Sequence, residues 1–212
     1  MGPRANSVSQ LSELYNVVIG IALSVAIFRV FTDGNQGLAS LNELTSRVPN
    51  LLIFLLLVIP FYHGAVRHLF ATYVEGGGSS RIKNGALLAD FVLLFVEGCL
   101  FVVMALSVTD IQVLVWVVVA LLVLDSVWGF LAWLAFTGAQ SQYAERTWAI
   151  INTVCAACLV TMMMVFNKFA SDPENAIRLS VVVAIFVFLR TVVDYSKTWK
   201  FYFPDGETVE LP

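Results

Sequence analysis

The chain has 212 residues, of which 59% are hydrophobic and only 13% are charged, and its formal net charge is −3. Soluble domains carry about 25% charged residues, so this composition excludes a soluble globular protein and predicts an integral membrane protein. The lack of a basic surplus also excludes a nucleic-acid-binding role.

Six segments are apolar over the roughly 20 residues that a helix needs to cross a bilayer. They are residues 11–31, 51–73, 86–108, 111–136, 148–168 and 176–198. Because these segments use most of residues 1–200, we predict a single all-α domain, a six-helix transmembrane bundle. The polar start of the chain lacks the pattern of a cleaved signal peptide, so we expect the first helix to direct insertion.

The connection between the first two segments, residues 32–50, has apolar residues at helical spacing. They are Leu38, Leu41, Leu44 and Val48. This spacing predicts a short amphipathic helix that lies on the membrane surface.

The basic residues outside the apolar segments predict the orientation of the chain. The side that holds both termini carries Arg4, Arg81, Lys83, Arg146, Lys197 and Lys200, and the other side carries Arg29, Arg47, Lys168 and Arg178. Cytoplasmic loops are the richer in Lys and Arg, so we expect both termini in the cytoplasm. The small size and the lack of a targeting signal favour a bacterial inner (plasma) membrane.

Eight ionisable residues fall inside the apolar segments, where charge is costly and marks either function or a paired core. Counted from the helix centres at about 1.5 Å per residue, they form two layers. The layer near the midplane is His63, Glu97, Asp125 and Arg190, and the layer nearer the cytoplasmic surface is Arg67, His68, Asp90 and Asp194.

The spacing of these residues places them on common helix faces. Residues four or seven apart share a face, and three pairs have such spacing. They are His63 with Arg67, Asp90 with Glu97, and Arg190 with Asp194. We therefore predict one interior site for binding or proton coupling, formed by His63, Arg67, Asp90, Glu97, Asp125, Arg190 and Asp194.

The leading functional hypothesis is a small transporter or ion channel in which a proton or cation engages Glu97, Asp125 and His63. A structural interpretation stays open, in which Arg67 pairs with Asp90 and Arg190 pairs with Asp194. On that interpretation the chain is a non-catalytic sensor, anchor or subunit of a larger membrane assembly. A metal-dependent membrane enzyme is the third hypothesis. It ranks below the other two because the sequence contains no motif for a catalytic nucleophile.

Neither copper nor haem is expected as a cofactor. Cys155, Cys158 and Met162 share a helix face and could bind Cu(I), although Cys and Met are also ordinary packing residues. A haem held by two histidines would need two copies of the chain, because His63 and His68 lie on different faces of one helix.

Three kinds of partner follow from the sequence. The bilayer is the first. A second copy or another membrane protein is the second, because residues 116–122 are apolar around the whole helix. The third is a cytoplasmic protein docked on the tail, residues 201–212, where the turn signal Pro204-Asp205-Gly206 allows either a small hairpin or a disordered end.

Overall fold

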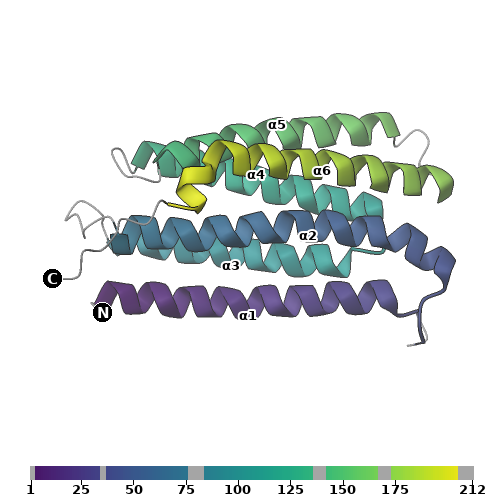
Figure 1. Cartoon of the computed structure of the whole chain (residues 1–212), viewed down its shortest axis with the longest axis horizontal. Helices are drawn as coiled ribbons and strands as arrows, with labels where there is room; N and C mark the ends of the chain where they lie inside the picture. Colours follow the sequence, from purple (N-terminus) through teal and green to yellow (C-terminus); the bar gives the residue numbers. More distant parts are fainter. Residues whose placement is uncertain (1–2, 34–36, 76–83, 136–141, 167–172, 205–212) are drawn as a thin grey trace.

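The computed structural model describes residues 3–33, 37–75, 84–135, 142–166 and 173–204. These residues form α1 (Pro3–Phe31), α2 (Leu41–Phe70), α3 (Asn84–Leu106), α4 (Ile111–Ala135), α5 (Gln142–Phe166) and α6 (Pro173–Tyr202), and a π-helical turn, η1 (Ala71–Glu75), extends α2 (Figure 1). Within the described residues, six helices are long and apolar enough to cross a membrane, which confirms the predicted all-α class. These residues contain no β-strand, only one isolated bridge between Thr32 and Leu38.

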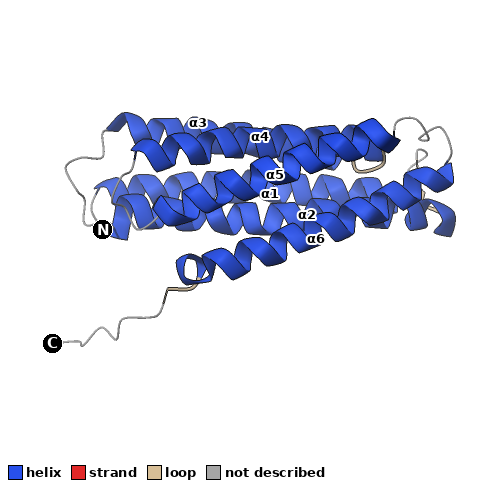
Figure 2. Cartoon of the chain, turned by 90° about the horizontal axis from the view of Figure 1, so that it is seen from above, coloured by secondary structure: helices blue, strands red, loops and turns tan. Residues whose placement is uncertain are grey.

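The helices do not pack in the order of the chain. α1 contacts α2 and α3, α2 contacts α6, α6 contacts α5, α5 contacts α4, and α4 contacts α3. This order closes a ring, so that residues from both halves of the chain face one interior. Figures 1 and 2 show that α1 begins and α6 ends at the same end of the bundle, which we call the terminal end.

Local hydrogen bonds explain two helix starts at the opposite end. Ser40 begins α2 through a capping box with Glu43, in which each side chain bonds the other residue's backbone N–H. Asp110 begins α4, because its Oδ1 accepts from the backbone N–H groups of Gln112 and Val113 at 2.9 and 3.2 Å. The residues from Leu41 to Val48, which predicted a separate surface helix, are the first turns of α2.

The last turn of α6 bends away from the helix axis (Figure 1). Thr198 has non-helical backbone angles (φ −111°, ψ 16°), and Arg67 Nε donates to the carbonyl of Phe201 at 2.8 Å. Beyond this bend, Phe201 and Tyr202 are again helical, so they do not form the first strand of the suggested tail hairpin. The rest of that hairpin falls on residues 205–212, outside the described residues.

Candidate functional site

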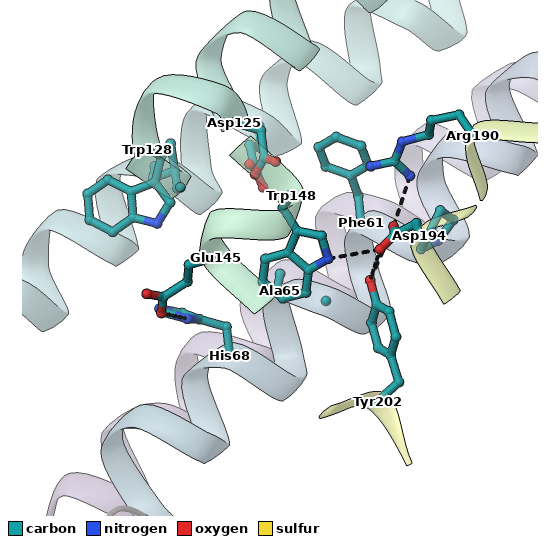
Figure 3. A pocket seen from close by; sticks show the side chains of 15 residues that line it. Phe61, Ala65, His68, Asp125, Trp128, Glu145, Trp148, Arg190, Asp194 and Tyr202 are labelled. Atoms are coloured by element: carbon teal, nitrogen blue, oxygen red, sulfur yellow. Dashed lines mark hydrogen bonds and ion pairs between the residues drawn. The ribbon is translucent and has the colours of Figure 1, made fainter. Parts of the chain in front are cut away.

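A cavity of about 50 Å³ lies inside the ring, between α2, α3, α4, α5 and α6 (Figure 3). Its walls are largely apolar and aromatic, and include Phe61, Trp128 and Trp148. Six ionisable side chains also line it, namely His68, Glu97, Asp125, Glu145, Arg190 and Asp194. A single water needs at least about 10–15 Å³, so the cavity has room for a few waters or one small cation.

Glu97 of α3 and Asp125 of α4 face each other near the centre of the helices. Each carboxyl group lies close enough to act on the charge of the other, and Tyr15 of α1 is the next neighbour of Glu97. Glu97 is only 2% exposed and Tyr15 only 3%. Two neighbouring buried carboxyl groups disfavour ionisation of both, so a bound proton or cation stabilises such a pair.

Asn152 of α5 connects this carboxyl pair to Arg190. The guanidinium donates from Nε and Nη2 to Asn152 Oδ1 at 3.2 and 2.7 Å, and Asn152 Nδ2 donates in turn to Asp125 Oδ2. Arg190 also lies over the ring of Phe61, 5.2 Å from its centroid. Arg190 and Asp125 are thus connected by hydrogen bonds to the same Asn152 amide.

Asp194 is the direct ionic partner of Arg190, at 3.1 Å between Oδ2 and Nη1. Three more side chains donate to this carboxylate, as Figure 3 shows in part: Trp148 Nε1 at 2.9 Å, Thr198 Oγ1 at 3.2 Å and the Tyr202 hydroxyl at 3.4 Å. Asp194 thus has one ionic partner and hydrogen-bond donors from both α5 and α6, as buried charges usually do.

His68 forms a second ionic cluster toward the terminal end. Its Nε2 lies 3.3 Å from Asp90 Oδ2, and its Nδ1 lies 3.1 Å from Glu145 Oε1. Tyr73 donates its hydroxyl to the same oxygen of Asp90 at 2.5 Å. The two carboxyl groups thus lie on opposite sides of the His68 ring, within ion-pair distance of its two nitrogens.

The structure brings together some of the predicted site residues and separates others. Glu97, Asp125, Arg190 and Asp194 line the cavity, and Asp90 joins it through His68. His63 and Arg67 do not line it.

His63 lies near the terminal end among rings of the α6 end, with its Nδ1 3.3 Å from the Tyr195 hydroxyl and its ring 4.6 Å from that of Tyr202. Arg67 pairs with Glu75 and with the Phe201 carbonyl, so the Arg67–Asp90 pair of the structural interpretation does not form. The Arg190–Asp194 pair of that interpretation does form.

Sequence reasoning missed several polar residues of the site, among them Glu145, Asn152, Tyr73 and Tyr202. Hydropathy places Glu145 outside the membrane because the fifth apolar segment starts at residue 148, whereas α5 begins at Gln142. The signal that could have found it is spacing, since Glu145 and Asn152 are seven apart on one face of α5 with Trp148 between them.

The weaker metal candidates lie on α5. Cys155 is buried, Cys158 is half-buried, and Met162 packs at the edge of the core. Over the part of the chain that the structure describes, no group of three or more His, Cys, Asp or Glu side chains is arranged to hold a metal ion.

The charge of the cavity wall determines what chemistry the site can perform. Four carboxyl groups, those of Glu97, Asp125, Glu145 and Asp194, face two basic groups, His68 and Arg190. Protons or a small cation would balance the difference. Comparison of the chain with protein-family models, with curated proteins and with solved structures found no match.

Proposed function

We propose that the chain is a small membrane transporter or channel for protons or a small cation, and that the Glu97–Asp125 pair is its binding group. The observation that carries the proposal is the excess of carboxyl groups around a water-sized cavity at the centre of a membrane-type bundle.

The carboxyl groups in excess over the basic groups are those of Glu97 and Asp125. Asp194 has its own Arg190, and Glu145 shares His68 with Asp90. Among the described residues, no basic side chain forms a salt bridge with Glu97 or Asp125. An uncompensated charge at the bilayer centre costs about 2.5–3.5 kcal/mol on insertion scales, so binding of a proton or cation at this pair would be favourable.

The size of the cavity favours a proton or small cation over an organic solute. Pockets for organic ligands are usually about 300–1,000 Å³. A cavity of about 50 Å³ admits waters that relay protons, or one cation without its hydration shell. Its walls extend from Glu97 and Asp125 toward His68, Glu145 and Tyr202, so we propose a half-channel that leads to the terminal end. By the basic-residue bias, this end would face the cytoplasm of a bacterial cell.

Reconstitution of the purified protein tests the proposal. Liposomes that contain a pH-sensitive dye and a potassium gradient are treated with valinomycin, and proton uptake is compared with that of protein-free liposomes. We expect uptake by the wild type and none by Glu97→Gln or Asp125→Asn. The control is Glu174→Gln, because Glu174 forms an exposed ion pair with Arg178 on α6 and does not line the cavity.

The ion is identified by a second arm of the same experiment. If proton uptake is absent, radioactive sodium and a potassium-sensitive dye test for a cation in liposomes prepared without valinomycin. A wild-type protein that carries none of the three ions, although monodisperse and folded, contradicts the proposal.

A non-catalytic sensor, anchor or assembly subunit is the rival proposal. An aromatic patch at the terminal end favours it, because the rings of Trp199 and Phe203 lie 4.4 Å apart and remain 58% and 45% exposed. Exposed aromatic residues are typical of protein interfaces. Co-purification of one stoichiometric partner, lost in Trp199→Ala, together with absence of ion flux would favour this rival.

A further inference from the structure

An apolar groove of about 460 Å³ runs along the outward side of α4 and α5, separate from the interior cavity. Its walls include Val127, Phe130 and Leu131 from α4, and Ile150 and Val154 from α5. Its volume lies in the range of pockets that hold organic ligands.

The groove exists because the two helices touch through small residues. A Cβ atom at Gly129 would lie 3.0 Å from the carbonyl oxygen of Glu145 and 3.4 Å from Ala149 Cβ, so the backbones are in close contact there. The hydroxyls of Ser126 and Thr153 bond to carbonyls of their own helices, each at 2.7 Å. The groove therefore has an apolar surface despite these two residues.

A charged and aromatic group lies next to the groove in the chain, toward the terminal end. The ring of Trp133 lies 5.6 Å from that of Phe130, which lines the groove, and the guanidinium of Arg146 lies 5.4 Å from the centroid of Trp133. Trp133 is two residues from the end of α4 at Ala135, and Arg146 is four residues from the start of α5 at Gln142. Tryptophan and arginine near helix ends are typical of the membrane–water interface.

We propose that this groove binds one anionic phospholipid, with an acyl chain along the groove and the phosphate at Arg146. The outward side of a membrane-spanning helix pair contacts the acyl chains of every lipid. Only the contact with the headgroup can therefore favour one class of lipid over another. A guanidinium held over an indole ring still has N–H groups that can bind a phosphate in a bidentate manner.

The charge at Arg146 supports an anionic headgroup. Among the described residues no carboxylate forms a salt bridge with Arg146, so the exposed arginine lacks an ionic partner within the described chain. A zwitterionic headgroup carries a cationic group that compensates its own phosphate, so its attraction to Arg146 is weaker. Basic sites between transmembrane helices bind anionic headgroups in this way.

Native mass spectrometry of the delipidated full-length protein tests the proposal, with phosphatidylglycerol and phosphatidylcholine of identical chains as probes. We expect the wild type to bind phosphatidylglycerol about fivefold more tightly, the effect of one basic residue at a membrane surface. Arg146→Gln should remove this preference, and Thr153→Phe, which fills the groove, should weaken both lipids. The control Arg178→Gln removes an exposed arginine of α6 and should preserve the preference.

Three results would overturn the proposal. The first is equal binding of the two lipids by the wild type. The second is an unchanged preference in Arg146→Gln, which would place the headgroup elsewhere. The third is a dimer that Thr153→Phe dissociates, which would assign the groove to a second copy of the chain. None of these measurements depends on ion transport, so the lipid site and the proposed function can fail separately.

Discussion

Asp194 and the Glu97–Asp125 pair line the same cavity, but their surroundings differ in one decisive respect. Asp194 receives an arginine and three further donors from its own helix and from α5. Glu97 and Asp125 lie next to each other, and the amide of Asn152 donates to Asp125. Asp194 therefore has an arginine as its ionic partner, whereas no salt bridge of the described residues reaches Glu97 or Asp125.

This difference separates two reasons for burying a carboxyl group in a bundle. A carboxylate with complete ionic and hydrogen-bond partners holds helices together, and removal of one partner is costly because the other is left charged. A carboxyl pair that lacks a counter-charge must gain a proton or a cation, and its occupancy can change. The same cavity thus holds one carboxylate with an ionic partner and one carboxyl pair that, among the described residues, forms no salt bridge.

The largest effect that the comparison predicts is the loss of Asp194. In Asp194→Ala the buried Arg190 loses its ionic partner, and Trp148 and Tyr202 lose their acceptor. We expect a loss of about 3–5 kcal/mol in unfolding free energy, the usual result of breaking a buried pair. Thermal unfolding in mild detergent measures it, with Glu174→Gln as the control at an exposed ion pair.

A somewhat smaller loss is expected for His68→Gln. The change leaves Asp90 and Glu145 without their shared cation, although the glutamine amide can donate to one of them and Tyr73 still donates to Asp90. We expect a loss of about 2–3 kcal/mol, below that of Asp194→Ala. A variant as stable as the wild type in the same unfolding assay would show that the His68 cluster is not structural.

Asn152→Leu should have an intermediate effect, because it removes the amide that connects the two regions. Leucine is close to asparagine in size, so the chief loss is hydrogen bonds. Asp125 and Arg190 each lose a buried partner, while Arg190 keeps Asp194. We expect a loss of about 1–3 kcal/mol and a reduced ion flux in liposomes. An ion flux equal to that of the wild type would indicate that transport does not require the hydrogen bonds of Asn152.

Hydropathy and helical spacing predict the structural side of this comparison well. The six apolar segments correspond to helices because hydropathy acts over whole spans. The pairing of Arg190 with Asp194 follows from their i, i+4 spacing on one helix, which needs no knowledge of the fold. Depth counting also predicts that Glu97 and Asp125 share an interior, since both lie near the middle of their helices.

Contacts that depend on helix ends and on packing order are not predictable in this way. His63 and Arg67 lie at suitable depths, but they contact α6 instead of the cavity: His63 lies beside Tyr195 and Tyr202, and Arg67 bonds to the carbonyl of Phe201 in the bent end. Glu145 lies beside Arg146 near the start of α5, and these two charges exclude the first turn of the helix from the apolar segment, which begins at residue 148 although α5 begins at Gln142.

Glu97→Gln should have the smallest effect on stability and a complete effect on transport. Glutamine keeps the shape of the side chain and can still bond to Asp125 and Tyr15, while one of two poorly compensated charges disappears. We therefore expect an unfolding free energy within about 1 kcal/mol of the wild type, since no salt bridge of the described residues is broken. Proton or cation uptake in liposomes should nevertheless fall to the level of protein-free liposomes. The variant has lost one of the two carboxyl groups that together bind the ion. If Glu97→Gln lowers the unfolding midpoint as much as Asp194→Ala does, then both carboxyl sites are structural and the contrast between them is lost.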